Sequence, residues 1–229
     1  MASNTTIGQL EITRYVQSTV KIKAGGLVVW IDPFMVNAEH IGEDKADLIL
    51  LTHEHGDHFS VDTLNAVAKE GTKLLCPNNG VISQIQGSVT ASPLALKEGD
   101  TTSAAGLDVR AVAGYNDIHP RNSGYDSFNI GYIFGMGGQQ VLHTGDTGLI
   151  SEFSSFGALD IAMVPIGGSG YTMDEDEAAK AVTEMLKPQI AIPIHYRFAT
   201  GGDPEKFKAA VGSAASVHIL DAVFPPMGG

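Results

Sequence analysis

The sequence predicts an α/β fold in which two β-sheets pack together and helices cover them from outside. Strand patterns dominate the first half of the chain, whereas strands and helices alternate in the second half. No repeat at solenoid periods and no linker-like composition interrupts the sequence. Because 229 residues suffice for one large core, we expect a single domain over residues 1–229.

Short apolar patterns at the start of the chain predict a β-meander. Residues 7–16 and 18–23 alternate in part between apolar and polar side chains, and residues 27–31 form a continuous apolar run. A loop or a short helix is expected over residues 34–46. The apolar residues 47–51 then predict a buried strand.

The next segment combines helices with a short strand. Ser60 is a suitable N-cap for a helix that extends through Glu70 and that Gly71 would end. We expect a short strand over residues 73–76 and a short helix over residues 78–86.

Strand patterns return in the middle of the chain. Residues 89–112 contain short alternating segments broken by glycine, which predicts consecutive antiparallel strands. Residues 114–127 are polar and aperiodic, and a loop of this length inside a domain is often functional. Residues 128–134 and 140–142 predict a hairpin around a glycine-rich turn.

The last third alternates between strands and helices. Buried strands are predicted over residues 160–165 and 189–194. Residues 174–186 form an amphipathic helix pattern with acidic side chains in its first turn, where they suit the helix dipole. A helix opening at Asp203-Pro204 and a strand over residues 216–220 complete the prediction.

A dense group of metal-ligand types follows the strand over residues 47–51. His53 and His55 are two residues apart, so their side chains point to the same side of extended backbone. A sharp turn at Gly56 can bring Asp57 and His58 back beside them. Imidazole and carboxylate ligands suit zinc, manganese and iron. This spacing favours two adjacent metals over the alternatives, a surface histidine cluster or a single structural zinc.

Further candidate ligands occur elsewhere in the chain. Asp146 and His195 each follow a predicted strand, and His119 lies in the long polar loop. Ligands in α/β folds gather at the carboxyl ends of strands, so these residues can meet the histidine loop. His143 is a rival to His119 for completing the first metal shell.

These motifs resemble the metallo-β-lactamase superfamily. The matching pieces are Asp32 at the end of an early strand, the HxHxDH of residues 53–58, His119, Gly145-Asp146-Thr147 and His195. More narrowly, Tyr115-Asn116, Pro165-Ile166-Gly167-Gly168 and Ile192-Pro193-Ile194-His195-Tyr196 are similar to a branch of small metal-dependent hydrolases related to L-ascorbate-6-phosphate lactonase.

The resemblance implies a four-layer αββα sandwich of the metallo-β-lactamase type, with the site at one edge between the sheets. It implies two divalent metal ions, for which zinc is the first choice and manganese or iron the alternatives. The implied ligand set is His53, His55 and His119 for one metal and Asp57, His58 and His195 for the other, with Asp146 bridging them. Asp32 would orient the histidine loop.

The resemblance also implies a metal-dependent hydrolase that uses a metal-bridging hydroxide on a small-molecule ester, lactone, amide or phosphoester. Asp57 is expected to move protons as well as bind metal. His143 and Tyr196 are candidates for contacting an oxyanion or protonating the leaving group. Arg121 and Arg197 flank two candidate ligands and could bind a substrate anion.

One position departs from the branch pattern. Relatives often carry Gly-His-Ser or Gly-Asn-Ala near the first hairpin, where this chain has Val16-Gln17-Ser18. Any role of that family histidine would have to pass to Gln17.

The composition of the chain limits the classes of binding partner that we expect. The net charge of −12 and the absence of any basic run argue against nucleic acid and anionic membranes, so a small-molecule substrate is expected. The single Cys76, the absence of a signal-peptide pattern and the absence of an apolar stretch of about 18 residues predict a soluble cytoplasmic protein. A homo-oligomer is compatible with the sequence.

The alternatives in function are a metal-dependent nuclease or phosphodiesterase and a metal-binding relative without activity.

Overall fold

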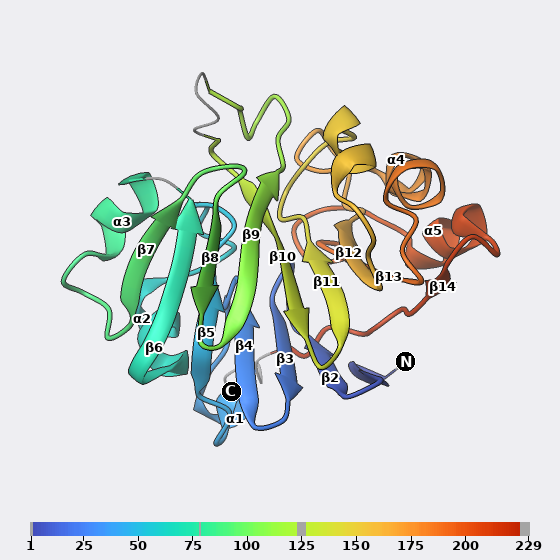
Figure 1. Cartoon of the computed structure of the whole chain (residues 1–229). Helices are drawn as coiled ribbons and strands as arrows, with labels where there is room; N and C mark the ends of the chain where they lie inside the picture. The colour runs from blue at the N-terminus through green and yellow to red at the C-terminus, as the bar shows by residue number, and fades with distance from the viewer. Residues whose placement is uncertain (1, 78, 123–126, 225–229) are drawn as a thin grey trace.

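A computed structural model of the chain describes residues 2–77, 79–122 and 127–224 (Figure 1). Its core is a pair of seven-stranded sheets with helices on their outer faces. This is the α/β sandwich of the metallo-β-lactamase type that the sequence predicts. Among the described residues, no helix combines the length and the apolar character that crossing a membrane requires.

The first sheet contains the first seven strands in chain order. They are β1 (Asn4–Ile7), β2 (Leu10–Arg14), β3 (Val20–Ala24), β4 (Leu27–Ile31), β5 (Ala46–Leu50), β6 (Ala68–Pro77) and β7 (Ser92–Leu96). Pairing is antiparallel from β1 to β4 and parallel from β4 to β7. The predicted meander is therefore confirmed, with an added turn at Gly8 that splits its first strand.

The second sheet repeats this arrangement with the last seven strands. They are β8 (Thr101–Ala104), β9 (Leu107–Ala113), β10 (Ile130–Met136), β11 (Gln139–His143), β12 (Ile161–Pro165), β13 (Ile190–Ile194) and β14 (Ser216–Val217). Pairing is antiparallel from β8 to β11 and parallel from β11 to β14. The predicted hairpin is confirmed as β10 and β11.

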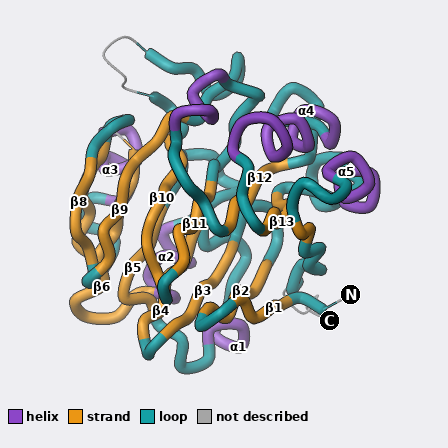
Figure 2. The backbone as a smooth tube through the Cα atoms, turned by 45° about the vertical axis from the view of Figure 1, so that its right-hand side comes forward, coloured by secondary structure: helices purple, strands orange, loops and turns teal. Residues whose placement is uncertain are grey.

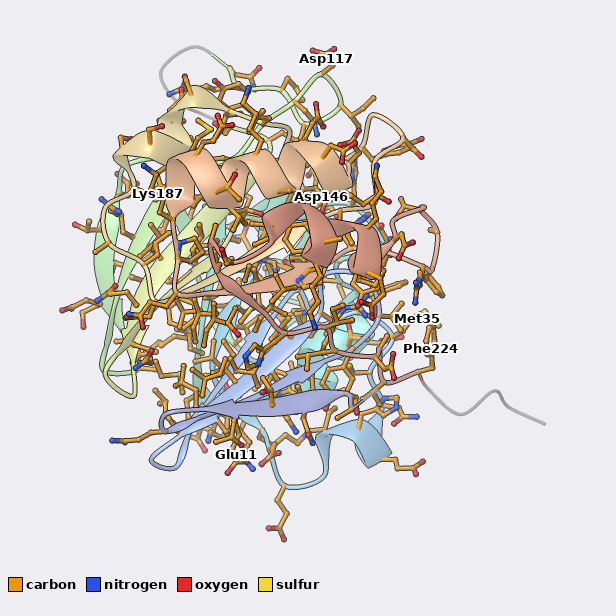
Figure 3. All side chains as sticks on the ribbon, turned by 90° about the vertical axis from the view of Figure 1, so that its right-hand side faces the viewer. Glu11, Met35, Asp117, Asp146, Lys187 and Phe224 are labelled. Carbon is orange, nitrogen blue, oxygen red and sulfur yellow. The ribbon has the colours of Figure 1, made fainter. Side chains whose placement is uncertain are left out.

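Helices lie outside both sheets (Figure 2). On the first sheet they are α1 (Ala38–Ile41), α2 (Val61–Val67) and α3 (Asn79–Ile85), and on the second they are η2 (Ser151–Ser155), α4 (Glu175–Lys180), its π-helical continuation η3 (Ala181–Leu186) and α5 (Pro204–Val211). Helices α4 and α5 pack side by side, as Figure 3 shows. Asp174 and Asp203 cap these two helices at the predicted positions.

Three apolar clusters separate the layers. The cluster between the sheets includes Val29 and Ile31 of β4, while Val28 and Trp30 of the same strand pack against the helices outside. Both faces of this strand are therefore buried, as expected for a strand in the parallel part of a sandwich.

Two element predictions are wrong. The helix capped by Ser60 ends at Val67 instead of Glu70, because β6 already begins at Ala68 and pairs with β5. Gly71 lies inside β6 with φ +86°, where the pairing with β5 shifts register. It therefore accommodates an irregularity in a strand and does not end a helix.

The second error concerns residues 89–112. β7 pairs in parallel with β6 in the first sheet, whereas β8 opens the second sheet by pairing antiparallel with β9. The chain thus changes sheets between Leu96 and Thr101, a step that local alternation of side chains does not encode. The strand expected over residues 216–220 is also shorter, since β14 covers Ser216–Val217.

Candidate metal centre

The histidine loop leaves the carboxyl end of β5 at the edge where the two sheets meet. The loops after β11 and β13 bring Asp146 and His195 to the same place from the second sheet. The predicted ligands fall into three groups whose ligand atoms lie within 4.8 Å of one another: His53, His55 and His119; His53, His58 and Asp146; Asp57, His58 and His195.

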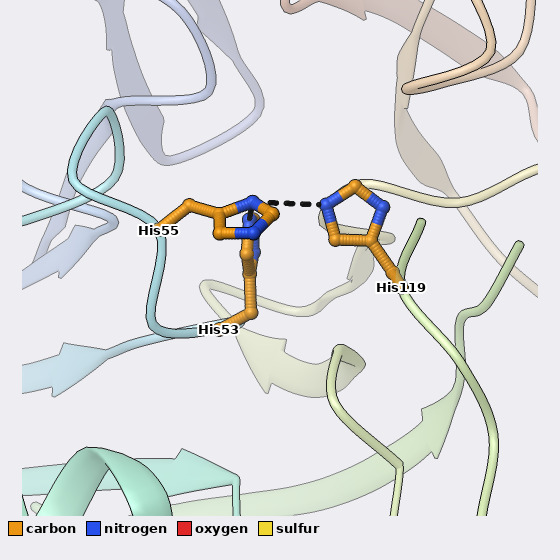
Figure 4. Close-up of side chains that lie close together, drawn as sticks. All are labelled: His53, His55 and His119. Carbon is orange, nitrogen blue, oxygen red and sulfur yellow. Dashed lines mark hydrogen bonds between the residues drawn. The ribbon is translucent and has the colours of Figure 1, made fainter. Parts of the chain in front are cut away.

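The first group contains only imidazoles. His55 Nδ1 lies 3.2 Å from His53 Nε2 and 3.2 Å from His119 Nε2 (Figure 4). Burial lowers the pKa of all three side chains, and that of His119 falls to about 4. These rings are therefore neutral near pH 7, which is the form that binds metal.

Asp57, His58 and His195 form what we call the second group; it is mixed in charge, and Asp146 lies beside it. Asp146 Oδ2 lies 3.0 Å from His195 Nε2 and 3.4 Å from His58 Nε2, and it also lies 4.0 Å from His119 Nε2 of the first group. Burial opposes the charged imidazolium forms of His58 and His195, but the nearby Asp146 carboxylate outweighs this effect. The pKa of His58 is raised, and the pKa of His195 is raised to about 9. One carboxylate oxygen thus approaches ligand atoms of both groups.

Asp32 fixes the histidine loop, as the family resemblance implies. Its Oδ1 accepts a hydrogen bond from the Thr52 backbone N (2.7 Å), and its Oδ2 accepts from Thr52 Oγ1 (2.7 Å). The same Oδ2 accepts from His58 Nδ1 at 2.9 Å. Since the Thr52 hydroxyl donates to Asp32, it can accept from His53 Nδ1 at 3.0 Å.

Asn116 holds the His119 ring in a similar way, a role that was not predicted from the sequence. Its Oδ1 accepts hydrogen bonds from the His119 backbone N (2.8 Å) and Nδ1 (2.9 Å). The available signal was an asparagine three residues before the histidine, a spacing typical of side-chain-closed turns. Its Nδ2 donates to the Tyr171 carbonyl, which ties this loop to the glycine-rich loop after β12.

These contacts set the tautomers. His53, His58 and His119 each use Nδ1 for a protein partner, so each presents Nε2 to the centre. The buried Nε2 of His58 has no hydrogen-bond partner among the described atoms. Imidazole nitrogens that lie within 4.8 Å of one another beside carboxylates are the donor set of a divalent metal site, so the residues fit metal ions.

A close approach of loops explains Gly145. A Cβ there would lie 2.3 Å from Asn129 Oδ1 and 2.7 Å from Thr52 Cβ, and its φ of +63° also favours glycine. Asn129 Oδ1 accepts a hydrogen bond from the Asp146 backbone N at 3.1 Å. The Gly-Asp motif is therefore shaped by packing against the histidine loop.

Two predicted catalytic residues lie elsewhere. His143 is fully buried, and its Nε2 lies 3.0 Å from the Ser18 carbonyl while its Nδ1 accepts from Gly145 N. The Tyr196 hydroxyl donates to the Leu220 carbonyl, and Arg14 stacks 3.9 Å from its ring centre. Neither side chain lines the cavity at the centre, so this geometry gives no support to their expected contact with substrate.

The two arginines are engaged with carboxylates. Arg121 pairs with Glu98 at 2.6 Å and with Glu152 at 2.5 Å. Arg197 is exposed and lies 3.4 Å from Asp203. Neither lines the cavity, so an anion-binding role is not supported for them.

The centre opens into a small cavity of about 230 Å³. Its lining consists of four of the candidate ligands and three side chains from neighbouring loops: His55, Asp57, Asp146, His195, Tyr171, Ala199 and Thr200. Tyr171 is 49% exposed, so the rim of the opening carries aromatic surface.

Comparison with known proteins agrees with this geometry. The family model described as the beta-lactamase superfamily domain matches residues 11–195. A UPF0173 metal-dependent hydrolase of Thermococcus kodakarensis is 34% identical over 208 residues, covering 86% of this chain and 90% of that protein. The corresponding hydrolase of Thermus thermophilus is 32% identical over 193 residues, covering 82% and 84%.

Solved structures share the fold. A protein from Parabacteroides distasonis superposes with a TM-score of 0.79 at 28% identity, covering 97% of this chain and all of that one (100%). A metallo hydrolase from Ignicoccus hospitalis has a TM-score of 0.76 at 26% identity, covering 93% and 95%.

Proposed function

This chain belongs to the beta-lactamase superfamily, among its UPF0173 metal-dependent hydrolases, and we propose that it cleaves a small, uncharged ester or lactone with two divalent metal ions. The observation that carries the proposal is the position of Asp146 Oδ2, which lies within 4.0 Å of His58, His119 and His195 nitrogens. An oxygen in that position can serve both histidine groups.

Seven residues would hold the metals: His53, His55 and His119 on one side, Asp57, His58 and His195 on the other, and Asp146 between them. Zinc is the first choice, with manganese or iron as alternatives, because the donors are nitrogen and oxygen. Bound divalent metal lowers the pKa of water to about 7 and polarises a substrate carbonyl.

Asp57 is suited to move a proton. It is the more exposed of the two candidate carboxylate ligands, and it lines the cavity. Burial opposes its charged form, but the nearby His195 and His58 imidazoles and the hydrogen bond from Gln17 outweigh this and hold its pKa below the usual range. The carboxylate is therefore ionised near pH 7, the form that binds metal, and its place in the cavity lets it contact a water that gives up a proton.

The cavity favours an uncharged substrate. No arginine or lysine of the described chain lines it, whereas Tyr171, Ala199 and Thr200 offer apolar and hydroxyl surface. The resemblance of the sequence motifs to the L-ascorbate-6-phosphate lactonase branch suggests cyclic esters as the reaction class, but the described lining contains no arginine or lysine to bind the phosphate of such a substrate.

The test joins metal analysis with a substrate panel. Protein purified in zinc-replete medium should carry about two metal ions per chain. It should hydrolyse neutral lactones or aryl esters at least tenfold faster than phosphoesters. His55→Ala and Asp146→Ala should abolish the activity, while Gln189→Met, far from the centre, should retain it. A protein that takes up no metal, or that prefers phosphoesters, contradicts the proposal.

A further inference from the structure

Gln17 lies in the turn between β2 and β3 and reaches the centre from the first sheet. The turn is closed by the Tyr15 N bond to the Thr19 carbonyl (2.8 Å), and Gln17 is completely buried. Its backbone carbonyl accepts a hydrogen bond from His195 N at 3.0 Å. The turn therefore touches the last of the candidate ligands directly.

The side-chain amide of Gln17 points at the second ligand group. Nε2 donates to Asp57 Oδ2 at 3.0 Å and lies 3.3 Å from His195 Nε2. The opposite orientation of the amide would set Oε1 against the Asp57 carboxylate, so the carboxylate fixes which atom faces it. Among the described residues, this amide donates the hydrogen bond that the Asp57 side chain accepts, while His195 Nε2 lies 3.6 Å from the same oxygen.

Two features of Gln17 oppose folding. Its Oε1 is buried and has no hydrogen-bond partner among the described atoms, and an unpaired buried acceptor destabilises the folded state. Its φ of +54° lies in the left-handed region, which is unfavourable for a residue with a side chain. Strain of this kind persists at functional positions.

We propose that Gln17 is a positioning residue that sets the metal affinity of the Asp57–His58–His195 group and leaves the His53–His55–His119 group unaffected. The inference rests on the proposed two-metal site and adds that its two positions depend on different supports. Asp57 is the most exposed carboxylate of the centre, with a side chain 36% exposed, so it needs an external donor to hold its orientation. The first group takes its support from Thr52 and Asn116 instead.

The experiment uses Gln17→Met, which keeps the length of the side chain and removes both amide groups. Metal-stripped protein is titrated with Zn²⁺ against a chromophoric chelator, and the two binding steps are fitted separately. The matched control is Gln189→Met, because Gln189 Nε2 also donates to a carboxylate, Asp160 Oδ1, at 2.7 Å. Asp57→Asn identifies the binding step that belongs to the second group.

Asp57→Asn identifies one of the two zinc-binding steps. We expect Gln17→Met to weaken zinc binding in that same step by about 10–100-fold and to leave the other step unchanged. Adding Gln17→Met to Asp57→Asn should produce little further loss, since Gln17 acts through the Asp57 carboxylate, which Asp57→Asn has already removed. Gln189→Met should bind zinc as the wild type does.

A second readout separates positioning from folding. The melting temperature of stripped Gln17→Met should equal or exceed that of the wild type, because the change removes an unpaired buried acceptor. Equal weakening of both steps, unchanged affinity, or a lower melting temperature accompanied by loss of both steps overturns the inference. A wild type that binds fewer than two zinc ions contradicts the proposed two-metal function itself, which distinguishes the two failures.

Discussion

At the residue scale, the centre depends on side-chain oxygens that accept a hydrogen bond from Nδ1 of a histidine, so that Nε2 of the same ring faces the centre. Asp32, Thr52 and Asn116 each serve a histidine in this way. The role of Asp32 followed from the family resemblance, whereas Asn116 was noted only as part of a matching motif and no role could be assigned to it. The sequence contains the polar groups, whereas their pairing depends on how loops from both sheets meet.

Replacing Asp32 by Asn tests this support. The carboxylate accepts three hydrogen bonds from Thr52 and His58. In Asn, one of the two oxygens becomes an NH₂ group, which cannot accept a hydrogen bond. We expect the free energy of unfolding of the stripped protein to fall by roughly 2–4 kcal/mol, measured by urea denaturation. Asp100→Asn, in an exposed turn with a single backbone contact, should cost under about 1 kcal/mol. Equal losses in the two variants contradict the role given to Asp32.

The stability of the stripped protein should also depend on pH in two directions. The pKa of His195 is raised to about 9, so its stabilising contribution is complete below its unfolded value near 6.5 and disappears as pH rises through about 9. The pKa of His119 is lowered to about 4, so stability falls as pH decreases from about 6.5 to 4. In melting curves between pH 5 and pH 9, His195→Gln should make the alkaline limb shallower, with the contribution of His58 remaining, and should leave the acid limb unchanged. A mutant with the wild-type alkaline slope is the contrary result.

At the scale of elements, local patterns predicted most of the strands and the capped helices. The helix starts at Ser60 and Asp203 could be predicted because these side chains hydrogen-bond to the first turn of the helix that follows. The end of α2 and the sheet assignment of β7 were not readable, because both depend on pairing with strands that lie elsewhere in the chain. The single ligand loop was thus easier to predict than the strand order around it.

Gly145→Ala tests how tightly two of these elements meet. The new Cβ would collide with Asn129 and Thr52 in addition to adopting positive φ. We expect a loss of roughly 2–4 kcal/mol in urea unfolding of the stripped protein, from overpacking and backbone strain together. Gly138→Ala is the control, since its φ is +79° but nothing lies within 4 Å, and it should lose only about 1–2 kcal/mol. Comparable losses would mean that backbone conformation alone accounts for Gly145.

At the scale of the whole molecule, the two sheets have the same plan. In each, an antiparallel half leads into a parallel half, and the ligand loops leave carboxyl ends of parallel strands β5, β11 and β13. Polar groups from residues 53 to 195 meet at one edge because of this plan. Spacing along the chain identifies the candidate ligands, but their convergence requires the sandwich.

The charge of the whole molecule makes a prediction about substrates. A net charge of −12 repels anions at long range, and salt screens that repulsion with a Debye length of about 10 Å at 0.1 M. For a neutral ester, kcat/KM should change less than twofold between 20 and 300 mM salt. For the same ester carrying a carboxylate on its acyl chain, kcat/KM should start lower and rise several-fold over that range. Steady-state kinetics on the pair measures this difference, with non-chelating buffer and constant zinc as the control. The contrary result is a carboxylated ester that is favoured at low salt and whose kcat/KM falls as salt rises. It would show that a positive charge at the site attracts the substrate, which contradicts the uncharged substrate class proposed for this cavity.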